Sequence, residues 1–358
     1  MVENPIELKL KRKLVAFSSK EKAISQKQAA STRRTAVIFL VLSLLNIAAI
    51  GLYIFSRTYA KAWRIGVAVS PAAFDSIMSR TIPALIAMGV AAFVLAVVSL
   101  SFQTITMSRI LTPSMIGFDS IFVGTQTVLV FFFGANFWLF ANPYWNYLLT
   151  ATVMVIISLV MYSFILRDHK NNIVFLLMFG LVLSGVIGNG TRYLQTIMNQ
   201  NDFFQVQAAT SVNVNNMNTT IIYLALPIMA LVIGMTMMRH RRFDVMSLGG
   251  EQARGLGIPY EREMRNNLIL IAIGMSVATA LIGSLTFLGL LAVNASREIF
   301  KTHKHLPLFM GSALLASLTL LLGQSVMELF EGRIPVTVII NLVGCSYIFY
   351  LILKEDKV

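Results

Sequence analysis

Few side chains in this 358-residue sequence are suited to covalent chemistry. There is no G-x-x-x-x-G-K-[ST] phosphate-binding loop, and the H-E-x-x-H and G-x-S-x-G signatures of common hydrolases are missing. His303 and His305 form an H-x-H pair, which is a poor metal site on a helix and more typical of a solvated loop. We therefore predict no catalytic residue, no metal site and no cofactor bound by this chain, and we classify it as a non-enzyme.

The composition excludes a soluble protein. Hydrophobic residues make up 56% and charged residues 13% of the chain, its mean hydropathy is +0.74, and soluble domains carry about 25% charged residues. We expect an all-α integral protein of the cytoplasmic membrane with many spans. Asp119 and Arg192 are the only deep ionisable candidates within these spans, whereas ion-coupled carriers usually need paired intramembrane groups. The energy for transport is therefore expected to come from another subunit.

The apolar runs and the basic loops together predict the topology. A span needs about 20 mostly apolar residues, and eight runs qualify: 35–56, 83–103, 116–136, 145–166, 173–197, 220–238, 306–329 and 335–353. The basic segments 239–267 and 297–304 should both be cytoplasmic. The chain must then cross out and back between them, turning near Gly283 and Ser284, in two short or tilted spans. This predicts about ten transmembrane helices with both termini in the cytoplasm.

Basic residues in the predicted cytoplasmic loops explain the formal net charge of +13. We therefore predict no nucleic-acid partner. Residues 1–34 hold nine basic residues and are expected to form a cytoplasmic tail. A basic tail of this kind is attracted to anionic membrane lipid. Residues 35–358 are expected to form one polytopic membrane domain, which includes the loop 239–267. Gly283, Gly289 and Pro335 interrupt its last spans, either as gate or hinge positions that line a cavity or as ordinary membrane-helix residues.

The cytoplasmic loop 239–267 is too ordered in pattern for a simple linker. A short apolar patch at 245–248 is followed by the double glycine Gly249–Gly250, which predicts a turn. Residues 251–254 can then form a short helix that stops at Gly255 and Gly257. Two very short helices joined at a glycine turn could dock in a groove of a cytoplasmic partner and transmit its motion as a rigid body. The alternative is an amphipathic loop on the membrane surface.

The same loop carries a family resemblance. SLGGEQARGLG (247–257) resembles the A-L-G-x-x-x-A-x-x-L-G coupling signature of the FecCD family, the iron-siderophore and cobalamin permeases of ABC transporters. Five positions match, and Ser247 replaces the first alanine: Leu248, Gly249, Ala253, Leu256 and Gly257. Further similar stretches, in order over about residues 75–353, lie at 102–120, 283–297, 303–317 and 333–344. TPSMIGFDS (112–120) and MNQNDF (198–203) resemble the catecholate or petrobactin-like subgroup.

The resemblance implies a permease subunit that imports a ferric siderophore by alternating access. It implies a second permease chain, identical or homologous, two cytoplasmic ABC ATPase subunits that carry the ATP–Mg, and an external siderophore-binding protein. The implied ATPase-coupling residues are Leu248, Gly249, Glu251, Ala253, Arg254, Leu256 and Gly257. Arg80 and Arg333 are candidates for docking the binding protein, although SRTIPA (79–84) and GQSVME (323–328) depart from the family's arginine motifs.

Three alternatives stay open at this point. The cargo could be cobalamin or haem instead of a ferric siderophore. The chain could also be an ion-coupled secondary transporter, which would need no ATPase, or an intramembrane enzyme, for which the spans offer no paired nucleophile and base.

Overall fold

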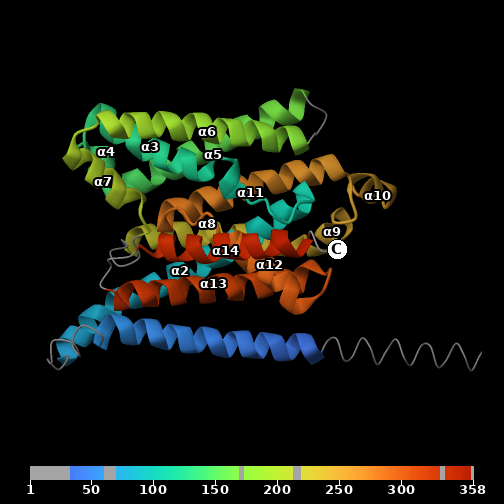
Figure 1. Ribbon diagram of the computed structural model, residues 1–358, viewed down its shortest axis with the longest axis horizontal. Helices are drawn as coiled ribbons and strands as arrows, with labels where there is room; N and C mark the ends of the chain where they lie inside the picture. Colours follow the sequence, from blue (N-terminus) through green and yellow to red (C-terminus); the bar gives the residue numbers. More distant parts are fainter. Residues whose placement is uncertain (1–32, 60–69, 169–172, 213–218, 331–334, 356–358) are drawn as a thin grey trace, which may run out of the picture. The chain divides into compact units, whose positions relative to one another are not determined.

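The computed structural model describes residues 33–59, 70–168, 173–212, 219–330 and 335–355. The chain forms two units, residues 1–44 and 45–358. The regular structure of the described residues is helical (Figure 1). This agrees with the all-α class, because a chain in lipid must satisfy its backbone hydrogen bonds within each segment. The predicted tail, residues 1–34, lies almost entirely outside the described residues.

The helices follow one another with short connections. After a first helix at Arg33–Tyr59, the order is α2 (Pro71–Thr106), the 3₁₀ turn η1 (Pro113–Ile116), α3 (Phe118–Phe133), α4 (Trp138–Ala141), α5 (Pro143–Asp168), α6 (Ile173–Ile197), α7 (Gln200–Thr210), α8 (Thr219–Met238), α9 (His240–Met246), α10 (Gly250–Gly255), α11 (Tyr260–Ile282), α12 (Leu288–Phe300), α13 (His305–Leu329) and α14 (Val336–Glu355).

Six helices among the described residues are long and apolar enough to cross a membrane: Arg33–Tyr59, Phe74–Thr106, Pro143–Ser163, Thr219–Met238, Tyr260–Ile282 and His305–Leu329. Two boundaries predicted from the sequence are wrong. Residues 71–82, assigned to a loop, belong to α2, which runs through Pro83. The helix after the predicted cytoplasmic segment 239–267 begins within that segment, at Tyr260, and is 23 residues long.

The turn between α11 and α12 was predicted correctly. Helix α11 ends at Gly283, whose φ of 93° is a conformation that other residues rarely adopt. Helix α12, with 13 residues, is about 20 Å long and shorter than the roughly 30 Å hydrocarbon core. Thr286 in the turn donates a hydrogen bond of 2.5 Å to Oδ2 of Asp119 at the start of α3. The irregular backbone between α11 and α12 is therefore packed against α3.

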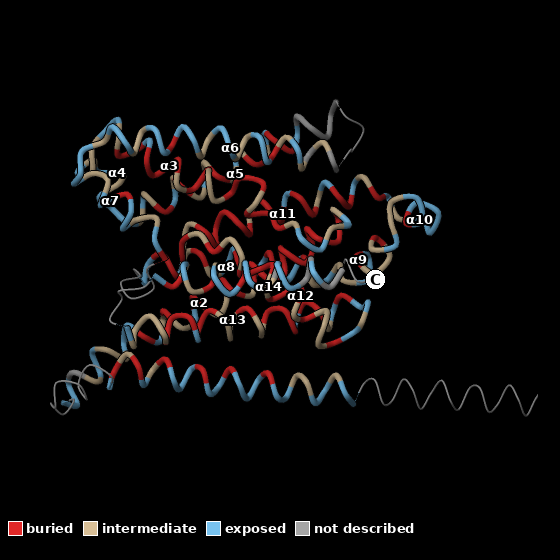
Figure 2. The backbone as a smooth tube through the Cα atoms, viewed as in Figure 1, coloured by how far each residue is buried: buried red, intermediate tan, exposed pale blue. Residues whose placement is uncertain are grey.

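Helix α2 lies at the centre of the second unit and packs against α8, α11, α12 and α13. Its residues from Ala84 to Ile105 are largely buried (Figure 2). Small residues allow this close packing, as is typical of helices in membranes. A Cβ atom added to Gly289 of α12 would lie 2.0 Å from Oγ of Ser99 and 3.2 Å from the Leu95 carbonyl oxygen.

Gly289→Ala should therefore lower the thermal unfolding midpoint of the purified protein. Overpacking of this kind costs about 1–3 kcal/mol. Gly89→Ala in α2 is the matched control, because its Cβ meets nothing within 4 Å, and a helical Gly→Ala change in open space stabilises by about 1 kcal/mol. Combining Gly289→Ala with Ser99→Gly should recover part of the loss. Equal midpoints for Gly289→Ala and Gly89→Ala would show that the α2–α12 contact is looser than described.

Candidate coupling site

Helix α10 projects at one end of the helices, beyond the start of α11, and α9 packs against the ends of α2 and α13 (Figure 1). We call residues 240–257 the docking segment. The two short helices and the glycine turn between them were predicted from the sequence, and the structure contains both. Gly249 has a φ of 105° at the turn and Gly257 a φ of 84° after α10, so both positions favour glycine. Helix α10 ends at Gly255, as predicted from the sequence.

Arg254 fixes α10 to the start of α11. Its guanidinium binds Glu251 at 2.6 Å and Glu261 at 2.6 Å, and it lies 6.0 Å from the centroid of the Tyr260 ring. The hydrogen bond to Glu261, together with the charges of Glu261 and Glu251, raises the pKa of Arg254 above its ordinary value. These contacts link α10 to the first turn of α11, although each exposed ion pair by itself contributes little stability.

The docking segment presents two leucines to its surroundings. Leu248 is 56% and Leu256 63% exposed, and the Glu251 side chain is 88% exposed. Ala253, in contrast, is completely buried. The sequence grouped all these residues in one site, and the structure divides them. Leu248, Glu251 and Leu256 form the accessible surface, while Ala253 packs beneath it and Arg254 holds it in place.

A polar cluster, in which His305 and Thr104 are buried and Asp244 is partly exposed, joins the docking segment to two membrane helices. Oδ1 of Asp244 in α9 accepts a hydrogen bond of 2.6 Å from the backbone N–H of His305 and lies 2.8 Å from its ring Nδ1. Nε2 of His305 lies 2.9 Å from Oγ1 of Thr104 near the end of α2. We call these three residues the Asp244 cluster. It places segment 239–267 and the start of α13 at the same end of the helices, as the predicted out-and-back crossing requires.

The expectation of a solvated loop for the H-x-H pair is wrong for His305, which is 3% exposed. Sequence reasoning missed its role because Asp244 and Thr104 lie 61 and 201 residues away. The ring packs between Phe243 of α9 and Phe309 of α13, with centroids 5.7 and 5.9 Å away. A second link joins α9 to α11, where Arg242 pairs with the buried carboxylate of Glu263.

The other predicted site residues lie apart from the docking segment. Arg80 is exposed in the first third of α2, and Pro335 is exposed just before α14. Gly283 and Gly289 flank the turn between α11 and α12. Arg192, considered a deep ionisable group, is exposed on α6 of this single chain. Arg333 lies outside the described residues.

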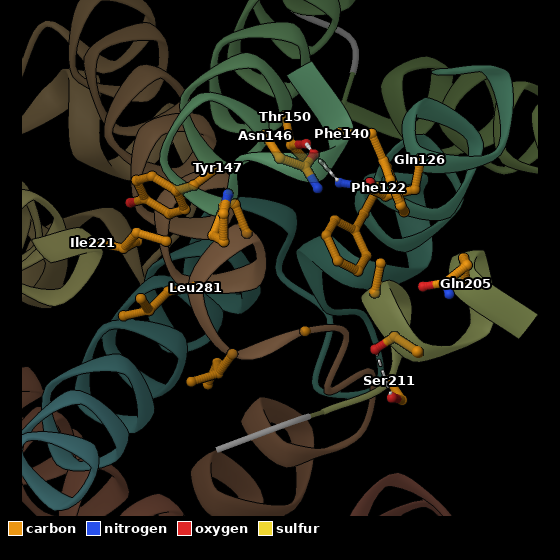
Figure 3. Close-up of a pocket in the computed structure, with 16 residues that line it drawn as sticks. Phe122, Gln126, Phe140, Asn146, Tyr147, Thr150, Gln205, Ser211, Ile221 and Leu281 are labelled. Carbon is orange, nitrogen blue, oxygen red and sulfur yellow. Dashed lines mark hydrogen bonds between the residues drawn. The ribbon is translucent and has the colours of Figure 1, made fainter. Parts of the chain in front are cut away.

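A neutral cavity of about 330 Å³ lies between α3, α5, α7, α8 and the end of α11 (Figure 3). Nε2 of Gln126 donates hydrogen bonds to Oδ1 of Asn146 at 2.9 Å and to Oγ1 of Thr150 at 2.7 Å. Phe122 and Tyr147 contribute aromatic rings to the wall. No charged side chain lines this cavity. It therefore offers hydroxyl and amide groups but no ligand set for a bare metal ion.

The comparisons with known proteins agree with this architecture. The model of the FecCD transport family matches residues 35–354. The chain is 38% identical over 286 residues to the petrobactin import system permease protein YclO of Bacillus subtilis (strain 168), a match that covers 79% of this chain and 90% of that protein. It is 29% identical to the petrobactin import system permease protein FatC of Bacillus anthracis, over 81% of this chain and 82% of that one.

A solved inward-facing structure of a metal-chelate type ABC transporter superposes with a TM-score of 0.72 at 18% identity, covering 89% of this chain and 99% of that chain. The fold is thus that of an ABC transporter permease. This chain belongs to the FecCD transport family, as its motifs indicated, and it is a multi-pass protein of the cytoplasmic membrane.

Proposed function

We propose that this chain is the permease subunit of an ATP-driven importer that carries a ferric siderophore across the cytoplasmic membrane. The observation that carries the proposal is the docking segment, a glycine-bounded pair of short helices with two exposed leucines and rigid links to α11, α13 and α2. An ion-coupled carrier would have no use for such a segment. Family membership and the names of the two petrobactin permease relatives support the same function.

In this mechanism the chain makes and breaks no covalent bond. ATP binding closes the partner ATPases, and their motion displaces the docking segment as a rigid body. The Arg254 contacts transmit the displacement to α11, and the Asp244 cluster transmits it to α13 and α2. These helices then change between outward-open and inward-open packings. A chelated iron needs no protein ligands, which fits the neutral lining of the cavity beside Gln126.

The proposal includes ten membrane segments with both termini in the cytoplasm. The docking segment contains Arg241 and Arg242 near its start, and Lys301 and Lys304 lie at the same end of the helices. By the positive-inside rule, these basic residues support a cytoplasmic location for that end. The opposite end, with the turn after Gly283, then faces outward. Arg80 and Arg333 are proposed to meet carboxylates of the external binding protein, and an identical or homologous permease chain completes the pathway.

The cargo is proposed to be a petrobactin-like catecholate chelate, because the two relatives are petrobactin permeases. The test is uptake of radioactive iron as ferric petrobactin in cells that lack this chain, with ferric hydroxamate, haem and cobalamin offered in parallel. Uptake of ferric petrobactin should be lost and should return with the wild-type gene. Loss of haem or cobalamin uptake alone would favour those cargoes, and uptake that persists without ATP hydrolysis would indicate an ion-coupled carrier.

A further inference from the structure

A second cavity lies at the end of the helices that carries the docking segment. Its volume is about 570 Å³, and it is formed by the end of α2, the turn at 107–110, the end of α12 and the start of α13. Arg109, Arg297 and Lys301 line it, together with His303. Three permanently charged cations thus surround one cavity, on the opposite end of α11 from the neutral cavity beside Gln126.

These cations have no acidic partner among the residues that the structure describes. Glu298 is the one carboxylate in the lining, and it accepts a hydrogen bond of 3.3 Å from the Tyr347 hydroxyl. Nε of Arg297 is buried without a hydrogen-bond partner. Burial disfavours the charge of Arg297 most, and the charge of Arg109 adds a smaller repulsion. Two guanidinium groups that repel each other beside an open cavity are stabilised by an anion placed between them.

The backbone that carries the Arg109 side chain is held in place at the cavity wall. Nε2 of Gln103 and Nδ2 of Asn294 both donate to the Arg109 carbonyl, at 3.0 and 2.9 Å. Gln103 is 2% and Asn294 4% exposed, so α2 and α12 hold the Arg109 backbone from two sides. Lys301 adopts the left-handed conformation, with a φ of 47°, at the end of α12. Because this backbone is already ordered, only the side chains of Arg109 and Lys301 lose conformational entropy on binding an anion.

We propose that this cavity binds an oxyanion of the phosphate type. Planar guanidinium groups recognise phosphate oxygens through paired N–H bonds, and a lysine adds a point charge. The source is either the headgroup of an anionic phospholipid or soluble inorganic phosphate, both of which present the same atoms. Because the cavity includes His305 and Ser247, a bound anion would stabilise the packing of α2, α12 and α13 beside the docking segment. Anion binding at this site is a property separate from the proposed transport of a ferric siderophore.

The first experiment uses the full chain, purified in a neutral detergent and stripped of lipid. Its thermal unfolding midpoint is measured by tryptophan fluorescence against sodium phosphate, with sodium chloride at equal ionic strength as the reference. We expect a saturable upward shift with phosphate alone, because a ligand that binds only the folded state stabilises it. Arg297→Gln and Arg109→Gln should each raise the apparent Kd about tenfold, the loss of one charged hydrogen bond.

Arg241→Gln is the matched control, since Arg241 is an exposed cation on α9 outside the cavity, and its phosphate response should be unchanged. Without phosphate, Arg297→Gln should keep or raise the midpoint because a repulsion is removed. A lower midpoint would instead assign Arg297 a purely structural role. Two variants are used so that a folding failure of one leaves the other informative.

The second experiment separates the two sources. The chain is placed in nanodiscs of phosphatidylcholine with or without phosphatidylglycerol. A lipid headgroup site predicts that phosphatidylglycerol abolishes the response to soluble phosphate in wild type, whereas a soluble-anion site predicts that the response persists. The same shift with phosphate and chloride in detergent, combined with no effect of phosphatidylglycerol on the midpoint, would overturn the proposal.

Discussion

Replacing Leu248 and Leu256 together with aspartate should nearly abolish ATP-driven uptake while the permease still folds. Both side chains are exposed on the docking segment, and the proposed ATPase groove would bury them. Burying one leucine is worth about 1.5–3 kcal/mol, so each substitution should weaken ATPase binding about tenfold or more. The measurement is ATP-dependent uptake of ferric petrobactin into vesicles that contain all subunits, together with co-purification of the ATPase.

The matched control is the double change Leu248→Met and Leu256→Met, which keeps both side chains apolar and should retain most of the uptake. The thermal midpoint of the isolated permease should be the same for both double variants, since neither leucine is part of the core. Wild-type uptake by the aspartate variant would remove the docking segment from the mechanism, and with it the main support for an ATP-driven importer.

Asp244→Ala should have the second large effect, and it should reduce both stability and coupling. The substitution removes the acceptor of the His305 backbone N–H and the partner of its ring Nδ1, leaving buried donors without a partner. Leaving a buried hydrogen-bond donor without its acceptor costs about 1–3 kcal/mol. We expect a lower unfolding midpoint in detergent and, in vesicles held below that midpoint, ATP hydrolysis that continues with less uptake.

Two comparisons distinguish a specific link from general damage. Asp244→Asn keeps a carbonyl oxygen that can accept both hydrogen bonds, so it should retain more stability than the alanine variant. Asp75→Ala removes an exposed carboxylate of α2 and should change neither quantity. A double-mutant cycle of Asp244→Ala with His305→Ala should give an interaction energy of about 0.5–3 kcal/mol. Additive losses would mean that the two residues do not act as a unit.

The sequence placed α11 incorrectly for a physical reason. Hydropathy assigns charged and polar residues to a loop, so Glu263 and Asn267 appeared to lie before the membrane helix. In the structure both are buried, and Glu263 pairs with Arg242 of α9. A charge enters the protein interior when a partner compensates for it, and that partner lies 21 residues earlier in the chain. No local pattern reports such a pairing.

The first turns of α2 show a related limit. Residues 71–82 contain Asp75, Arg80 and several polar residues, which indicate a loop when they are considered alone. They continue the helix because backbone hydrogen bonding is cooperative once an apolar helix has formed beside them. The position of Arg80 on a helix, rather than in a loop, follows from this extension.

The sequence by itself determined the membrane class, the helical fold, the turn at Gly283 and the two short helices of the docking segment. Each of these depends on local properties: apolar runs of spanning length, the distribution of basic residues, and glycines where the backbone needs a positive φ. The tertiary structure alone decided which residues of the docking segment are accessible, that His305 is buried against Asp244 and Thr104, and that Arg109, Arg297 and Lys301 share one cavity. Those facts arise from helices far apart in the sequence packing together, and burial and charge proximity exist only after they have done so.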